Sequence, residues 1–150
     1  MAVIKPTITL TANKNSATSN AGPLSVALSL SATDLLTVDN VQSQIVTCST
    51  TEATIIDGDA VSGGDGAGGT VGGFIYMKNI SAASATNLIH VGIVADGGSA
   101  TDLTASGDTA RLFTLKVGEF AWFPFDYTMD ITVDATTSGQ LLEYWIFDRG

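Results

Sequence analysis

The sequence predicts an all-β protein: an antiparallel, jelly-roll-like β-sandwich of about eight or nine short strands in a single domain, 1–150. Only 14% of the residues are charged, against roughly 25% in a typical globular chain. Ser and Thr together number 33 and Gly 16, and these residue types favour strands and turns. Short stretches that alternate apolar and polar residues lie between turn-rich segments, as in half-buried antiparallel strands.

The first half of the chain contains several such stretches. Residues 7–11 (TITLT) and 25–31 (SVALSLS) alternate with a period of two, which is the period of a strand with one buried face. Shorter strands are expected at 35–38, 44–48 and 54–56.

Two segments of the first half lack this alternation. The polar stretch NKNSATSNAG predicts an extended N-terminal arm over 1–21. Residues 57–73 (DGDAVSGGDGAGGTVGG) hold eight of the 16 glycines. Because glycine loses more conformational entropy on ordering than any other residue, this segment is predicted to be a flexible loop.

The second half contains six further predicted strands, at 74–80, 88–95, 111–117, 120–123, 130–134 and 141–147. A two-residue turn at Gly118–Glu119 predicts a hairpin between the third and fourth of these. That pairing assigns Phe120 and Trp122 to the core face.

The other face of the predicted hairpin is mixed, and it carries Phe123 and Phe125 as candidate interface residues. The alternative is that a loop of the same chain covers these two rings, because large apolar groups are mostly buried. Pro124 cannot donate a hydrogen bond to a sheet, so the strand is expected to end there or to lie at an edge.

The last strand, LLEYWIFD, has apolar residues on both faces. Leu142, Tyr144 and Ile146 share one face, whereas Trp145 and Phe147 share the other. We expect both faces to be covered and name Trp145 and Phe147 as candidate interface residues toward a neighbouring subunit.

The charge balance excludes some classes of partner. The net charge is −9 and the six cationic residues are scattered, so neither nucleic acid nor an anionic membrane surface is expected as a partner. No apolar run has the length of a signal peptide or a membrane span, which predicts a soluble protein made in a cytoplasm. With Cys48 as the single cysteine, no intrachain disulfide is possible.

The sequence offers little for catalysis, and no enzymatic activity and no cofactor are expected. His90 is the single histidine and no G-x-S-x-G motif accompanies it, so a structural, hydrogen-bonded histidine is favoured. Most Asp residues occupy turn sequences. The best metal candidate is a weak calcium site formed by Asp57, Asp59 and Asp65 in the glycine-rich loop; a loop without metal is the favoured interpretation.

Five motifs follow one another in the second half: GGFIYMKNIS, LIHVGIV, RLFTLKVGEFAWFPFD, MDITVDA and LLEYWIFD. Over 72–148 this order resembles small virion proteins of tailed phages, especially those of marine and cyanobacterial phages. The GEF hairpin is also similar to a stretch of cupin-like jelly rolls, but the cupin metal histidines are absent.

The phage resemblance implies a structural protein on the outer surface of the virion. The favoured role is a capsid decoration or cement protein that binds the major capsid protein, as a homo-oligomer and preferably a trimer. The rival is a tail-fibre or tail-tip module that binds a host saccharide or envelope protein, with Trp122 or Trp145 as a stacking platform. A third hypothesis is a hydrolase that acts on envelope sugars, but no acid/base pair for such a reaction can be identified in the sequence.

Overall fold

The computed structural model describes residues 2–4, 7–11, 25–29, 36–58, 73–98, 102–104 and 109–149. Side chains are described for Thr7 and, within these ranges, from Val41 to Asp148. The described part of the chain is all-β, as predicted. Its strands are β1 (Ala2–Ile4), β2 (Thr7–Thr11), β3 (Ser25–Ser29), β4 (Leu36–Cys48), β5 (Ala53–Ile56), β6 (Gly73–Asn79), β7 (Ile89–Ala95), β8 (Arg111–Leu115), β9 (Phe120–Phe125), β10 (Met129–Ala135) and β11 (Gln140–Arg149).

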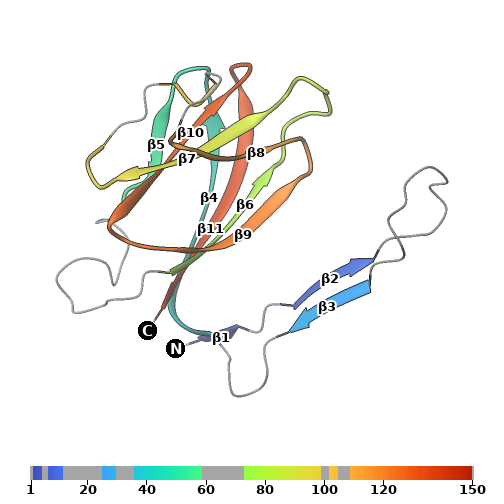
Figure 1. The fold of residues 1–150 in the computed structure, drawn as a ribbon, viewed down its shortest axis with the longest axis vertical. Coiled ribbons are helices and arrows are strands. Elements are labelled where there is room, and N and C mark those ends of the chain that lie inside the picture. Colours follow the sequence, from blue (N-terminus) through green and yellow to red (C-terminus); the bar gives the residue numbers. More distant parts are fainter. Residues whose placement is uncertain are drawn as a thin grey trace.

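Two antiparallel sheets pack face to face as a β-sandwich (Figure 1). One has the order β1-β4-β11-β6-β9 and the other β5-β10-β7-β8. From β4 to β11, every connection except β7–β8 passes from one sheet to the other. This arrangement of eight strands is that of a jelly roll, and it confirms the predicted fold class.

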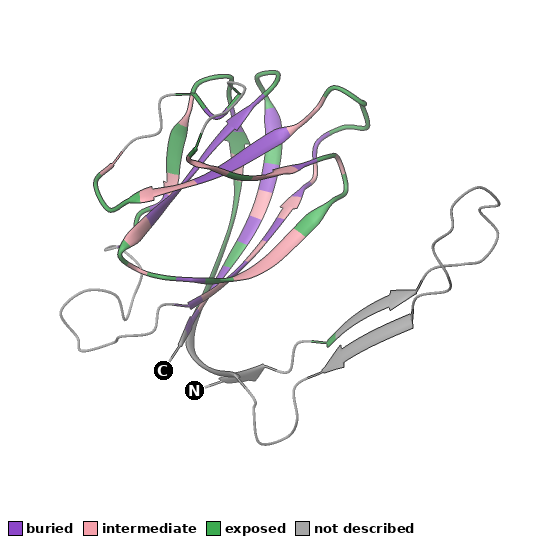
Figure 2. Cartoon of the chain, in the orientation of Figure 1, coloured by how far each residue is buried: buried purple, intermediate pink, exposed green. Residues whose placement is uncertain are grey.

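The core lies between the two sheets and is built by alternate residues of each strand (Figure 2). The five-stranded sheet contributes Ile75, Met77 and Leu142 with no exposed surface, and the four-stranded sheet contributes Val91 and Ile131 in the same state. A one-residue shift of any central strand would exchange its buried and exposed residues. The period-two pattern of the sequence therefore determines which face of each strand is buried.

The predicted hairpin between β8 and β9 is wrong. β8 pairs with β7 in the four-stranded sheet, whereas β9 pairs with β6 in the five-stranded sheet. The turn between them crosses from one sheet to the other, with Gly118 at a φ of 82° and a hydrogen bond from Glu119 N to Lys116 O. A glycine at this position accommodates the positive φ of a type II turn as readily as that of a hairpin turn, so the sequence signal was ambiguous.

Asn79 holds this crossover in place. Its fully buried side chain donates hydrogen bonds to the carbonyls of Leu115 and Asn87, at 3.0 and 3.1 Å, and its backbone carbonyl accepts one from Gly118 N. One side chain of the five-stranded sheet thus satisfies backbone groups at the end of β8. The hydrogen bonds fix the position of β9 relative to the four-stranded sheet.

Among the described strands, β2 and β3 form a separate two-stranded sheet and pair with each other alone. Figure 1 shows this hairpin standing apart from the sandwich; the strand that precedes it in the chain, β1, lies at the edge of the five-stranded sheet. The expected arm over 1–21 lies partly outside the described residues; where it is described, it consists of β1 and β2.

β9 is an edge strand, as the proline in its sequence predicts. Pro124 is exposed and lies opposite Phe74 of β6, the only strand with which β9 pairs in the described part of the chain. Because proline has no N–H to donate, it is compatible with an edge and incompatible with the middle of a sheet.

Adjacent residues of β11 provide a test of the register. Leu142 is completely buried, whereas Leu141 is 37% exposed on the opposite face. Leu142→Ala is expected to lower the free energy of unfolding by about 2–5 kcal/mol, because it removes a buried side chain and leaves a cavity. Leu141→Ala is the matched control and is expected to cost much less. Urea unfolding of both variants measures the difference; equal losses would contradict the register.

Candidate interaction surface

The outer face of the five-stranded sheet carries an unusual concentration of aromatic side chains. Six of the eleven aromatic residues of the chain lie there, from three adjacent strands, and together they are called the outer aromatic face: Phe74, Tyr76, Phe120, Trp122, Trp145 and Phe147. The register explains the grouping. Phe147 lies beside Phe74, and Tyr76 lies between Trp145 and Trp122, so the rings form rows across β11, β6 and β9.

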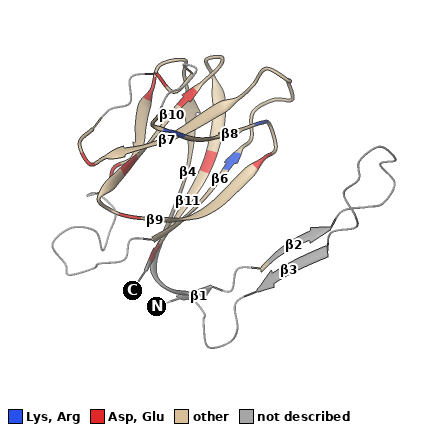
Figure 3. Cartoon of the chain, viewed as in Figure 1, with Lys and Arg blue, Asp and Glu red and all other residues tan. Residues whose placement is uncertain are grey.

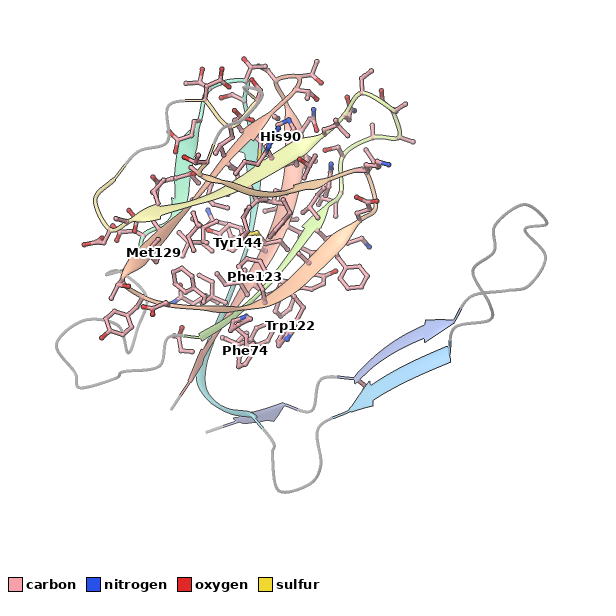
Figure 4. All side chains as sticks on the ribbon, in the orientation of Figure 1. Phe74, His90, Trp122, Phe123, Met129 and Tyr144 are labelled. Carbon is pink, nitrogen blue, oxygen red and sulfur yellow. The ribbon has the colours of Figure 1, made fainter. Side chains whose placement is uncertain are left out.

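The rings contact one another along these rows. Trp122 stacks on Phe74 with ring centroids 5.5 Å apart and also contacts Phe147 at 5.0 Å. Phe147 in turn stacks on Trp145 at 6.3 Å, and Tyr76 packs against Phe120 at 6.0 Å. Figure 4 shows Phe74 and Trp122 pointing away from the sandwich, whereas Phe123 and Tyr144 lie between the sheets. Mutual packing makes the outer aromatic face a continuous apolar surface.

Much of this surface is accessible to solvent. Phe120 is 59% exposed and Trp145 38%, although both are large apolar side chains. Exposed aliphatic residues of β4 and β11 extend the surface sideways, namely Val41, Ile45 and Leu141. Contiguous apolar patches of this kind are rare on soluble monomers and mark sites of interaction.

Charged groups are scarce on the outer aromatic face. Figure 3 places most of the described acidic residues at loops and strand ends. Lys78 of β6 and Glu143 of β11 are cross-strand neighbours within the face. Trp145 Nε1 donates a hydrogen bond to a Glu143 carboxylate oxygen at 3.3 Å, which orients the indole. Burial, with the nearby Glu143 carboxylate adding to it, raises the pKa of Tyr76.

The two faces of β9 are the reverse of those predicted. Phe123 and Phe125 were expected to be interface residues, but Phe125 is only 3% exposed and Phe123 packs against the core, edge-on to Phe113 at 5.5 Å. Phe120 and Trp122, assigned to the core, lie outside. The error follows from the hairpin prediction, because pairing β9 with β6 instead of β8 reverses which face meets the core.

Trp145 and Phe147 occupy the face that the sequence predicted for them. Leu142, Tyr144 and Ile146 are buried on the opposite side of the same strand. Phe74 and Tyr76 were not predicted to belong to the surface. Their signal was present in the alternation FIYMK, whose inner members are Ile75 and Met77.

Three carboxylates gather at one end of the four-stranded sheet. Oxygens of Asp57, Asp96 and Asp130 all lie within 4.8 Å of one another. Asp130 is buried, and its two oxygens accept hydrogen bonds from Gly58 N and Gly97 N, at 3.0 and 3.1 Å. Of the predicted calcium candidates Asp57, Asp59 and Asp65, Asp57 belongs to this cluster, and Asp59 and Asp65 lie outside the described residues. The carboxylate of Asp130 thus has a structural role in joining two turns.

His90 lies on the outer face of the four-stranded sheet and is 6% exposed. Its Nδ1 is 2.7 Å from Thr114 Oγ1, as expected for a structural, hydrogen-bonded histidine. Burial lowers the pKa of His90, and the nearby Asp134 carboxylate opposes this shift. Burial likewise raises the pKa of Asp134.

A short segment, 102–104, covers this polar group. The nearby backbone of Leu103 and Thr104 partly offsets the rise in the pKa of Asp134, and Leu103 is completely buried. Gly92 makes room for it, since an added Cβ would lie 2.5 Å from Leu103 Cδ2. The polar cluster beside His90 is therefore closed by packing.

Cys48 is 2% exposed in the core. Burial, followed by the effect of the Asp134 carboxylate, raises the pKa of its thiol to about 11. Because the thiolate is the reactive form, Cys48 in the folded chain is protected from oxidation and from disulfide exchange.

No family model matches the chain, and no curated protein matches it. It is similar to a solved structure described by the words "Bacillus endospore appendages form a novel family of disulfide-linked pili", with a TM-score of 0.46 and 16% sequence identity. The alignment covers 82% of this chain and 98% of that chain. A likeness of this degree assigns neither family nor function. Among the described residues, no helix is long and apolar enough to cross a membrane.

The lowered pKa of His90 predicts a loss of stability in mild acid. In the unfolded chain His90 takes up a proton near its ordinary pKa of 6.5, whereas in the folded protein it does so only at lower pH. The unfolded state therefore binds more protons below that value, and the free energy of unfolding falls as the pH drops through this window. Urea unfolding between neutral and mildly acidic pH measures the effect.

His90→Gln is the control, because it keeps a hydrogen-bonding side chain and removes the titration. Asp134 contributes in the opposite direction at lower pH, where the folded state binds the extra proton, and it is present in both proteins. The wild type is expected to lose more stability than His90→Gln as the pH falls. Parallel pH profiles would contradict the shift.

Proposed function

We propose that this chain is a non-enzymatic structural protein of a virus particle, and specifically a decoration protein of a tailed-phage head. In this role it binds the lattice formed by the major capsid protein on the outer surface of the virion, after synthesis in the host cytoplasm. The observation that carries the proposal is the outer aromatic face, where Phe120 and Trp145 stay exposed beside four further rings.

The composition of this face supports a role in assembly. Fully buried centres of protein interfaces are rich in Trp, Tyr and Phe and poor in charged residues. The outer aromatic face has both properties, with Lys78 and Glu143 as cross-strand neighbours among the rings. The order of motifs over 72–148, which resembles small virion proteins of tailed phages, supplies the class of particle.

The mechanism proposed for such a protein is thermodynamic. A subunit that binds the assembled lattice and not its separated parts stabilises the particle by mass action, and no cofactor is required. A homo-oligomer, preferably a trimer, multiplies the contacts that one subunit makes. When every equivalent position of the lattice is occupied, the small binding free energy of each subunit is added many times to the stability of the particle.

A tail-fibre or tail-tip module is the alternative function. The observation that favours it is the stacked pair Trp145 and Phe147, since an exposed indole supported by a second ring is a platform on which a sugar ring can stack. In that case the ligand would be a host saccharide and the outer aromatic face would remain uncovered in the particle.

Copy number in purified particles separates these functions. A decoration protein is expected at a fixed ratio to the major capsid protein, equal to one or to a simple fraction set by the lattice. Quantitative mass spectrometry of purified virions measures this ratio. A handful of copies per particle would instead favour the tail module, and absence from the particle would contradict both virion proposals.

A further inference from the structure

We propose that the β2–β3 hairpin of one copy packs on the outer aromatic face of a second copy, so that the chain associates head to tail. The hairpin and the face are different surfaces of the same chain, and each would be covered by the other. This inference rests on the proposed homo-oligomer, and it is independent of the capsid as the final partner.

Among the described elements, the hairpin pairs with no strand of the sandwich. β2 and β3 pair only with each other, and a two-stranded hairpin is at best marginally stable in water. In the register, Ile8 lies opposite Leu28 and Leu10 opposite Val26, so the apolar positions share one face of the hairpin. The alternate positions are Thr, Ser and Ala. This is the pattern of a sheet that has one side against an apolar surface.

The dimensions of the two surfaces agree. Each strand of the hairpin has five residues, which at about 3.4 Å per residue gives a length of about 17 Å. The rings of β6 and β9 occupy the paired positions from Phe74–Pro124 to Lys78–Phe120, also five residues along each strand. Two sheets that pack face to face require such matching apolar surfaces.

The distribution of charge favours the same pairing. The chain has a net charge of −9, so two copies repel each other wherever acidic groups approach. Neither TITLT of β2 nor SVALS of β3 contains a charged residue. The outer aromatic face is also poor in charge, with Lys78 opposite Glu143 at one end of its rows. These two surfaces can approach each other without like-charge repulsion.

The path of the chain favours a second copy over the chain's own face. β1 runs from Ala2 to Ile4 beside residues of β4 that run from Val38 to Leu36. This direction leads away from Val41, the residue of β4 that lies opposite Phe147. β1 therefore leads out beyond the outer aromatic face. Only two residues, Lys5 and Pro6, separate β1 from β2 in the sequence. Figure 1 shows the hairpin extending away from the sandwich of its own chain.

Two double variants of the full chain test the inference. Leu10→Ser with Leu28→Ser alters the hairpin, and Phe120→Ser with Trp145→Ser alters the face at two exposed positions. Leu112→Ser is the matched control, because Leu112 is 51% exposed and lies on β8 in the other sheet. Sedimentation velocity over a wide range of concentrations measures self-association, and circular dichroism with urea unfolding checks that each variant folds.

Wild type and Leu112→Ser are expected to associate. Each double variant loses two interface anchors, so its self-association is expected to be weaker by a factor of about a hundred or more. An equal mixture of the double variants is expected to form dimers, since one supplies an intact hairpin and the other an intact face. Association of the hairpin variant at wild-type strength, or failure of the mixture to form dimers, would overturn the inference.

The unmodified chain provides a second test that does not depend on the folding of variants. Both tryptophans, Trp122 and Trp145, belong to the outer aromatic face, so tryptophan fluorescence reports on that face alone. Dissociation on dilution is expected to shift the emission to longer wavelength as the rings become exposed to water. Dissociation without a shift, or a wild type that is monomeric at every concentration, would overturn the inference.

These outcomes are separable from those of the particle experiment. A chain that is monomeric in solution but present at lattice ratio in virions would overturn head-to-tail association and leave the decoration role standing. A chain that associates as described but is absent from virions would support head-to-tail association and overturn the decoration role.

Discussion

The alternation of side chains along β11 is the constraint on which both the core and the candidate surface depend. β11 lies between β4 and β6 at the centre of the five-stranded sheet. Its inward residues Leu142, Tyr144 and Ile146 are buried, while Trp145 and Phe147 face outward beside the rings of β6 and β9. The strand period is two, so neither set can move without displacing the other. Packing of the interior and assembly of the exterior are thus coupled through one strand.

The fold class follows from short-range patterns, and the topology does not. Strands such as 7–11 and 130–134 were recognised because alternation and turn residues are local properties. The partner of each strand is a long-range property, and the turn at Gly118 is compatible with a hairpin and with a crossover. Because β9 joins β6 rather than β8, the assignment of Phe123 and Phe125 to an interface failed together with the hairpin.

The candidate surface was predicted in part for the same reason. Trp145 and Phe147 could be found because a single strand with apolar groups on both faces needs two covers. The six rings come together only when β6, β9 and β11 are adjacent, and these strands are separated by long stretches of sequence. The cluster of Asp57, Asp96 and Asp130 is likewise assembled by the fold, from three segments that no spacing rule connects.

Pro124 has a consequence for how the molecule behaves when it is crowded. It stands on the edge strand β9, where an incoming strand would require a backbone donor that proline lacks. The outermost strands at two other edges, β1 and β5, have only three and four residues. Short edges and prolines are the devices by which natural sheets avoid growing into cross-β fibres. At high local concentration this chain is therefore biased toward reversible contacts between its faces and away from amyloid-like polymerisation.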